Sequence, residues 1–257
     1  MPDGIGTIAI GMEAEFQIQP FETGLLGRPV GKLYVRGGWP LEERPASLTA
    51  GWRREGVWLV SCRVPEGSPA IGGLEKNGFR AIETLVTFRR QLRAELMPGG
   101  IAIAGPETAD ACVAIARRAF TNDRLHRDRR VPDGVADLVR ERWIRNNLGG
   151  RADASFVARD GGRVVGFSLC LLDGDEAVID LIAVDGEYRQ KGLGRALVLG
   201  ALAHYGGRAR TMQVGTQADN LPSLKLYRGA GFVEAERQIT LHWVNSEAAP
   251  ALKDLSR

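Results

Sequence analysis

Residues 180–194 read DLIAVDGEYRQKGLG, and this stretch decides the fold of the chain. An apolar strand is predicted over 179–184, a tight glycine-containing segment follows, and a helix is predicted over 195–205. Gly192 and Gly194 let the backbone pass close to a ligand without a Cβ clash. The first N–H groups of the new helix, together with its dipole, favour an anion at the same place. The segment therefore predicts a binding site for a phosphate-bearing cofactor.

The glycine pattern excludes two common nucleotide-binding loops. A dinucleotide-binding loop requires G-x-G-x-x-G, and the phosphate loop of NTPases requires G-x-x-x-x-G-K-[ST]. Neither fits here, because Gly194 is followed directly by Arg195-Ala196-Leu197. The pattern that is present is R-x-x-G-x-G, from Arg189 to Gly194, after a strand that ends at Val184.

A second motif lies downstream, at 220–232. It reads NLPSLKLY from Asn220 to Tyr227 and is followed by Gly231-Phe232. The two motifs, in this order and at this separation, resemble the GCN5-related N-acetyltransferase (GNAT) superfamily, in which the second element is N-x-x-[AS]-x-x-L-Y-x-x-x-G-F. The resemblance implies a mixed α/β sheet of the GNAT fold, N-acetyltransferase activity, acetyl-coenzyme A as co-substrate and no metal.

The resemblance also implies which residues hold the cofactor. Backbone N–H groups of the loop take the pyrophosphate, and the strand edge at Ile182 and Val184 pairs with the pantetheine amides like an added strand. The cofactor-binding residues carried over from the family motif are Ile182, Ala183, Val184, Arg189, Gln190, Lys191, Gly192, Leu193, Gly194, Arg195 and Asn220. For Asn220 a second interpretation stays open, since an asparagine at this position before Pro222 is also a plain helix N-cap.

Acetyl transfer needs an acid for the leaving thiolate and a way to deprotonate the amine. Tyr227 occupies the family's position for the acid, since a phenol with a pKa of about 10 is protonated at neutral pH. The alternative for Tyr227 is a packed amphipathic aromatic side chain. Glu83 is the candidate base, because it follows Gly78-Phe79 on a strand expected to face the active cleft. An ordered water in its place, or a merely solvated carboxylate, stays open. Poorer candidates for the base are the three histidines, His126, His204 and His242.

The composition is that of an ordinary globular protein, with 44% hydrophobic and 25% charged residues. A net charge of +3 does not favour nucleic acid as a partner. No apolar run is long enough to span a membrane, and no basic stretch followed by an apolar one marks a secretion signal near residue 1. The three cysteines are too far apart for a C-x-x-C pair, which favours buried thiols and a reducing, cytoplasmic compartment.

A cluster of breakers at 97–100, Met-Pro-Gly-Gly, predicts a domain boundary. We expect a degenerate GNAT-like domain over 1–98, a catalytic domain over 99–245 and a frayed tail over 246–257. Strands are expected at 32–35, 57–64, 82–88, 155–159, 164–172, 177–184, 211–215 and 234–244. Helices are expected at 107–120, 135–146, 195–205 and 221–229.

The two halves share a degenerate repeat with an offset of 153 residues. Residues 68–79 align with 221–232, so that Gly78 meets Gly231, and the strand before each helix matches as well. Such a repeat of one strand–helix unit predicts that the first half began as a second copy of the same fold.

The copies differ where the chemistry lies. Leu74 stands at the position of Tyr227, and Gly67 stands at that of Asn220. The first half has Gly37-Gly38-Trp39-Pro40 in place of the glycine loop, which puts a proline where an amide donor is needed. We therefore expect one working cofactor site, in the second half, with the first half building walls on the substrate side.

Three further segments narrow the resemblance to the TDP-fucosamine acetyltransferase family, which acetylates the 4-amino group of a nucleotide-linked 6-deoxy sugar. The segments are FETGLLG from Phe21, AFTNDRLHRD from Ala119 and WIRN from Trp143. The chain departs from this family at Leu226, where a basic residue is expected, and in its longer cofactor loop. Both departures leave the identity of the sugar open.

Arg124 and His126 are the candidate substrate-binding residues, since arginine forks in their loop can grip a diphosphate. The alternative is a solvated charged loop. The expected partner is a small-molecule amine, a nucleotide sugar for preference, and a homodimer is kept open. Two other functions stay open: acetylation of another primary amine, such as an aminoglycoside, a polyamine or a protein N-terminus, and a non-catalytic acyl-CoA-binding module.

Overall fold

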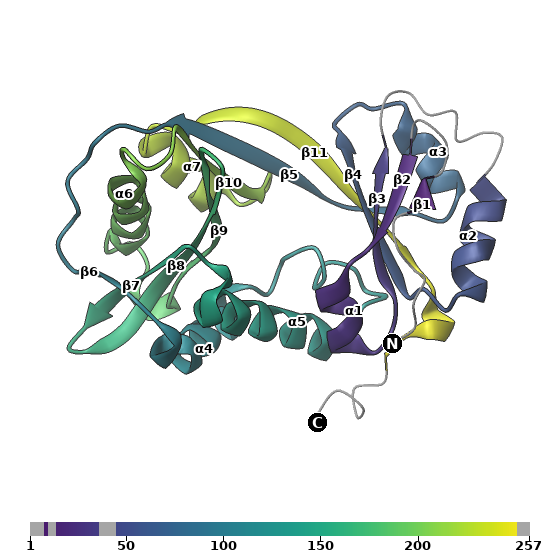
Figure 1. The fold of residues 1–257 in the computed structure, drawn as a ribbon, viewed down its shortest axis with the longest axis horizontal. Helices are drawn as coiled ribbons and strands as arrows, with labels where there is room; N and C mark the ends of the chain where they lie inside the picture. Colours follow the sequence, from purple (N-terminus) through teal and green to yellow (C-terminus); the bar gives the residue numbers. More distant parts are fainter. Residues whose placement is uncertain (1–7, 10–13, 36–44, 251–257) are drawn as a thin grey trace. The chain divides into compact units, whose positions relative to one another are not determined.

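The computed structural model describes residues 8–9, 14–35 and 45–250 of the chain (Figure 1). The chain divides into a first unit, with residues 1–85, 124–136 and 237–257, and a second unit, with residues 86–123 and 137–236. This division does not coincide with the boundary expected at 97–100. The Pro98-Gly99-Gly100 breaker does interrupt the secondary structure, but it lies inside the second unit, between two of its strands.

A mixed sheet forms the centre of the second unit, with the strand order β5-β10-β9-β8-β7-β6. The strands are β5 (Arg80–Gln91, with 86–91 in this unit), β6 (Ile101–Ile103), β7 (Ala154–Asp160), β8 (Arg163–Asp173), β9 (Glu176–Val184) and β10 (Thr211–Gln217). Neighbours from β6 to β9 are antiparallel, whereas β9 and β10 are parallel. Parallel neighbours need a crossover connection, and a helix between them provides it.

Helices cover both faces of this sheet. They are α4 (Ala109–Ala119), α5 (Asp133–Asn146, with 137–146 in this unit), α6 (Leu193–Tyr205) and α7 (Leu221–Gly229), with short helical turns η1 (Pro106–Thr108), η2 (Asn147–Arg151) and η3 (Gly186–Tyr188). One core cluster joins Leu197 of α6 to Phe156 of β7, and another joins Ile115 of α4 to Val157. Phe156 and Val157 are adjacent, so the two clusters lie on opposite faces of the sheet.

The first unit repeats this plan with the strand order β1-β2-β3-β4-β11. Its elements are β1 (Ile8–Ala9), β2 (Ala14–Ile18), α1 (Pro20–Leu26), β3 (Val30–Val35), α2 (Pro45–Arg54), β4 (Leu59–Pro65), α3 (Ala70–Lys76) and β11 (Val233–Val244, with 237–244 in this unit). Trp52 lies at the centre of the core, with its ring 5.1 Å from that of Phe16, 6.1 Å from Phe79 and 5.4 Å from Trp243. Four aromatic rings thus anchor the helices to the sheet.

The structure supports the internal repeat element by element. Shifted by 153 residues, β5 at 80–91 falls on β11 at 233–244, and β4 and α3 fall on β10 and α7. Each unit has an antiparallel pair of strands followed along the sheet by a parallel pair. In the first unit β2 and β3 are antiparallel and β3 and β4 parallel; in the second, β8 and β9 are antiparallel and β9 and β10 parallel. The first half's Gly37 to Pro40 lies outside the described residues, so the loss of its glycine loop stays a prediction.

The last strand of each repeat is exchanged between the units. Strand β5 begins in the first unit and ends in the second, where Leu92 N–H, just after the strand, donates to Arg210 O at 2.9 Å. Strand β11 begins in the second unit and pairs with β4 of the first from Gln238 to Val244. The sheet of each unit is therefore completed by the strand that follows the helix of the other repeat. Strand β5 follows α3 of the first repeat and completes the second sheet, whereas β11 follows α7 and completes the first.

The expected tail begins later than predicted. Asn245 caps a short helical turn, η4 (Ser246–Ala248), by accepting the Glu247 N–H, and Ala248 is buried. The expectation of a frayed segment from Ser246 is therefore wrong up to Pro250, since this segment packs, and 251–257 lie outside the described residues.

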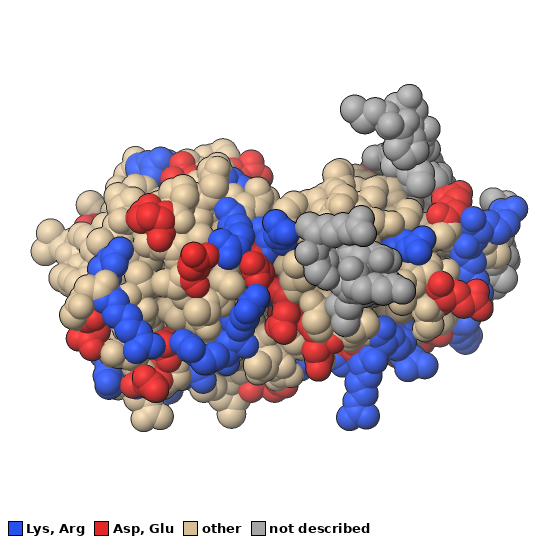
Figure 2. All heavy atoms as spheres, turned by 90° about the horizontal axis from the view of Figure 1, so that it is seen from below, with Lys and Arg blue, Asp and Glu red and all other residues tan. Residues whose placement is uncertain are grey.

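The cysteines, the helix lengths and the charged side chains of the described residues bear on what the composition predicts. Cys62, Cys112 and Cys170 are unpaired and buried, and burial raises the pKa of their thiols to about 12, 11 and 12. No described helix is long and apolar enough to cross a membrane, and the same residues contain no His, Cys, Asp or Glu cluster suited to a metal ion. Figure 2 shows basic and acidic side chains interspersed on one face, rather than one basic field.

Candidate functional site

A β-bulge in β9 opens the sheet of the second unit. Along β8 the register passes from Leu169 opposite Leu181 to Cys170 opposite Ile179, so Asp180 is the extra residue. The parallel pairing of β9 with β10 ends at Ile179, although both strands continue through described residues. Bulges bend the strand that carries them. The backbone of β9 beyond Asp180 is thus left without a partner on β10, as an added strand requires.

The loop after β9 is fixed at its start. Asp185 is almost fully buried and accepts hydrogen bonds from Glu187 N at 3.3 Å, Arg118 Nη2 at 2.8 Å and Arg163 Nη2 at 3.2 Å. These contacts tie the first residue after the strand to α4 and to β8. The loop that follows is therefore held by ion pairs at its entry.

The two loop glycines have different roles. Gly192 has φ +81°, a left-handed conformation, and a Cβ added there would contact nothing within 4 Å. Gly194 lies in the first turn of α6, where an added Cβ would stand 3.5 Å from Leu226 Cδ2. Gln190 has φ +61° and is the one non-glycine residue with positive φ in the described chain. Such strain is characteristic of functional loops.

The helix after the loop begins earlier than predicted, at Leu193 instead of residue 195. Leu193, Gly194 and Arg195 therefore form its first turn, where N–H groups lack intrahelical partners and the dipole favours an anion. Arg189, Lys191 and Arg195 are all exposed around this end. Left-handed backbone, a helix N-terminus and exposed cations together fit a pyrophosphate.

Tyr227 is buried on α7, with only 2% of its surface exposed. Its ring lies 5.9 Å from that of Phe88 and 6.1 Å from that of Phe232. Burial raises the pKa of its hydroxyl, which therefore stays protonated at neutral pH. The described residues give this hydroxyl no hydrogen-bond partner, so a proton donor is available to an incoming group.

Asn220 acts as a helix cap in the structure. Its Oδ1 accepts the Ser223 N–H at 3.3 Å, and its Nδ2 donates to Thr216 Oγ1 at 3.1 Å. The amide thus joins the end of β10 to the start of α7. Its role as a coenzyme contact stays a prediction, whereas the cap interpretation is confirmed.

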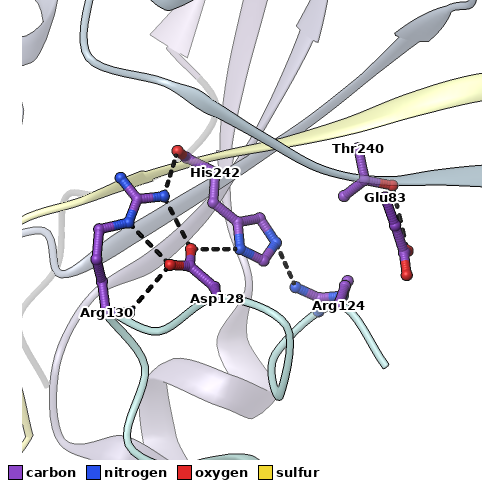
Figure 3. A network of polar contacts seen from close by, with 6 residues as sticks. All are labelled: Glu83, Arg124, Asp128, Arg130, Thr240 and His242. Atoms are coloured by element: carbon purple, nitrogen blue, oxygen red, sulfur yellow. Dashed lines mark hydrogen bonds and ion pairs between the residues drawn. The ribbon is translucent and has the colours of Figure 1, made fainter. Parts of the chain in front are cut away.

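Glu83 lies in the first unit, on the part of β5 before the strand crosses to the second. Its side chain is only 2% exposed and lies 3.9 Å from Arg63 Nη2, and Thr240 Oγ1 donates to it at 3.4 Å (Figure 3). The alternative of a solvated carboxylate is therefore wrong. A buried carboxylate beside a hydroxyl suits proton transfer, and its catalytic role stays a prediction.

Arg124 belongs to a polar network in the first unit that the sequence did not predict (Figure 3). Its Nη1 lies 3.3 Å from Nε2 of His242, and Nδ1 of His242 lies 3.1 Å from Asp128 Oδ2. Arg130 holds that carboxylate with Nε and Nη2, each at 2.8 Å, and also donates to His242 O at 2.9 Å. His126, the other predicted substrate residue, is half-buried on the same loop.

The network fixes the protonation of its members. His242 is fully buried, and burial lowers its pKa to about 4 despite the hydrogen bond to Asp128. Burial alone would raise the pKa of Asp128, but hydrogen bonds from His242 and Arg130 bring it well below its usual value. Because arginine can only donate, the neutral imidazole accepts from Arg124 at Nε2 and donates from Nδ1 to Asp128. The guanidinium of Arg124 is thereby oriented by a buried acceptor.

The family model matches the half that carries the glycine loop, and one curated relative matches most of the chain. The model of the Acetyltransferase (GNAT) family matches residues 111–232. The spore coat polysaccharide biosynthesis protein SpsD of Bacillus subtilis is 31% identical over 56% of this chain, which spans 50% of SpsD. A mycothiol acetyltransferase of Clavibacter michiganensis is 32% identical over 82% of this chain and 76% of its own length. The protein is thus an N-acetyltransferase.

Solved structures show the same fold across both units. A GCN5-related N-acetyltransferase from Sphaerobacter thermophilus has a TM-score of 0.61 at 18% identity, over 95% of this chain and 83% of that one. A tandem GNAT protein from the clavulanic acid biosynthesis pathway has a TM-score of 0.55 at 14% identity, over 93% and 80%. These structures show the fold, and the match to the Clavibacter michiganensis mycothiol acetyltransferase shows that the chain belongs to the GNAT acetyltransferase family. The family implies acetyl-CoA as co-substrate and an amine as acceptor.

Proposed function

We propose that this enzyme transfers an acetyl group from acetyl-CoA directly to the amine of a nucleotide-linked deoxy amino sugar. The observation that carries the proposal is the oriented guanidinium of Arg124, held by the buried neutral His242. A fixed arginine fork recognises phosphate oxygens better than a mobile one, because less side-chain entropy is lost on binding. The likeness to SpsD, a polysaccharide biosynthesis protein, supports a sugar as acceptor.

The residues of the chain have defined tasks in this proposal. Backbone N–H groups of 190–195 hold the pyrophosphate, and Ile182 and Val184 pair with the pantetheine amides. Bound acetyl-CoA supplies the thioester that the neutral amine attacks. Tyr227 gives its phenolic proton to the departing sulfur as the carbon–sulfur bond breaks. Glu83 takes the proton that the amine loses, directly or through one water.

A second acceptor is favoured by a different observation. The mycothiol acetyltransferase of Clavibacter michiganensis matches 82% of this chain, which requires likeness in both halves. The bS18-alanine N-acetyltransferase of Escherichia coli matches only 37% of it. An acceptor of the kind that mycothiol acetyltransferases use is therefore the second candidate, ahead of a protein N-terminus. Oriented arginines also disfavour polycationic acceptors by like-charge repulsion.

Thiol release from acetyl-CoA, measured across a panel of acceptors, tests the proposal. The panel holds a TDP-linked 4-amino-6-deoxy sugar, the same sugar without the nucleotide, the acceptor of the mycothiol acetyltransferases and a peptide with N-terminal alanine. We expect the highest kcat/KM for the TDP-linked sugar, with a clear loss when the nucleotide is removed. Preference for the mycothiol-type acceptor would select the second candidate, and activity on the peptide alone would refute both.

A further inference from the structure

The bulge residue of β9 is held from outside the sheet. The helical turn η2 follows α5 directly and contains Gly150 with φ +119°, a conformation that favours glycine. Its first residue, Asn147, is 1% exposed, and Nδ2 of this buried amide donates to Asp180 Oδ2 at 3.0 Å. Its last residue, Arg151, donates from Nη1 to the same oxygen at 3.0 Å. Two groups of one turn thus converge on one carboxylate.

The side chains of Asn147, Arg151 and Asp180 are all hydrogen-bonded to one another. Arg151 Nη1 also donates to Oδ1 of Asn147 at 2.8 Å, so the amide uses its oxygen on Arg151 and its nitrogen on Asp180. Asp180 is the residue at which β9 bulges against β8, and it directly follows the last residue that pairs with β10. The contacts therefore act at the point where the two strands part.

An ordinary surface ion pair would not explain this arrangement. The side chain of Arg151 is 43% exposed, and an exposed pair of this kind contributes little to stability. A buried asparagine, however, costs free energy unless its hydrogen bonds are made, and an apolar side chain would pack at lower cost. Irregular helical turns and bulges both occur preferentially beside functional sites.

We propose that Asp180, clamped by Asn147 and Arg151, is a positioning residue that sets the bend of β9 and so presents the backbone of Ile182 and Val184 to the cofactor. The inference rests on the proposed placement of the pantetheine along β9. The clamp touches neither the pyrophosphate loop nor Tyr227 among the contacts described. Its loss should therefore weaken cofactor binding without removing the acid.

Calorimetric titration of the full chain with acetyl-CoA and with coenzyme A tests the clamp. Asp180→Ala removes both contacts, and Arg151→Met removes one from an exposed position that tolerates change. We expect Kd for both ligands to rise about tenfold or more in Asp180→Ala, as the loss of charge-assisted hydrogen bonds implies, and less in Arg151→Met. Arg151→Lys should restore most of the affinity.

The control is Asp175→Ala, which removes an ion pair with Arg210 at 3.0 Å in the turn just before the same strand. This pair is more than half exposed on both sides, so its loss should leave Kd unchanged. Peptide-level hydrogen exchange should show faster exchange over 178–186 in Asp180→Ala and not in Asp175→Ala.

The outcomes distinguish failure of the cofactor site from failure of the Asp180 clamp. Failure of the wild-type chain to bind acetyl-CoA would remove the cofactor site on which the clamp rests. Normal binding by wild type, with equal Kd in Asp180→Ala and Arg151→Met, would overturn the clamp alone. Unchanged Kd with a lower kcat and a shifted pH profile in Asp180→Ala would also overturn it, because Asp180 would then act on protons.

Discussion

Replacing Tyr227 by phenylalanine separates its chemistry from its packing. The ring contacts with Phe88 and Phe232 do not involve the hydroxyl, so the Phe variant keeps them. The hydroxyl has no hydrogen-bond partner among the described residues, so its removal costs no hydrogen bond. The free energy of unfolding should therefore change by less than about 1 kcal/mol, in either direction.

The expected loss of turnover is much larger. A positioned general acid contributes about 10²–10⁴-fold, so kcat should fall by that factor in Tyr227→Phe while Kd for coenzyme A stays within about twofold of wild type. Tyr227→Ala provides the contrast, because loss of a buried ring costs roughly 3–5 kcal/mol of stability. Since burial raises the pKa of Tyr227, wild-type activity should show no loss from its ionisation up to about pH 10.

Thiol release under saturating acetyl-CoA gives kcat, calorimetry gives Kd, and thermal unfolding gives the stability comparison. Full activity in Tyr227→Phe would remove this residue as the acid. A parallel fall in kcat and in unfolding temperature would instead make its role structural.

Three further predictions follow from the site. The unfolding free energy should fall by on the order of 3 kcal/mol as pH drops from about 6.5 to about 4. The pKa of His242 is about 4 in the folded protein and about 6.5 in the unfolded chain, so the unfolded chain binds the extra proton in that window. Urea unfolding should show a flatter pH profile in His242→Gln, and a pH profile equal to that of wild type would exclude this group. Gly192→Ala should destabilise the fold by about 1–2 kcal/mol, because residue 192 has a positive φ. Gly194→Ala should leave the unfolding free energy unchanged and weaken acetyl-CoA binding. Destabilisation by Gly194→Ala and not by Gly192→Ala would contradict these roles. Glu83→Gln should lower kcat/KM for the amine about tenfold or more at constant Kd for acetyl-CoA, and wild-type rates would leave deprotonation to water.

The glycine loop was predictable from sequence because its conformation is local. Gly192 can adopt a left-handed φ without a Cβ clash, and the strand before it and the helix after it follow from apolar periodicity. All expected strands and helices are present, with ends shifted by a few residues. Short elements such as β1, β6 and α1 escaped prediction, because short segments carry little periodic signal. The ten-residue helix α2 was missed as well.

The polar networks were not predictable, because they depend on contacts between distant residues. Asp128 and His242 are 114 positions apart, and nothing near His242 in the last strand marks it as a network member. The bulge at Asp180 likewise depends on the register with β8, and a strand pattern alone does not reveal an extra residue. The boundary at 97–100 was expected from local breakers, whereas the compact units follow the sheets.

The exchange of β5 and β11 determines when this protein can fold during synthesis. Arg63 Nε donates to Thr240 Oγ1 at 3.1 Å across 177 positions of sequence, so the edge of β4 stays unpaired until the last strand of the described chain has left the ribosome. Unpaired strand edges invite association with other chains. A fragment ending at residue 98 should therefore aggregate instead of folding as an independent domain, and a chain whose two repeats exchange their last strands cannot be separated into two independently folded halves.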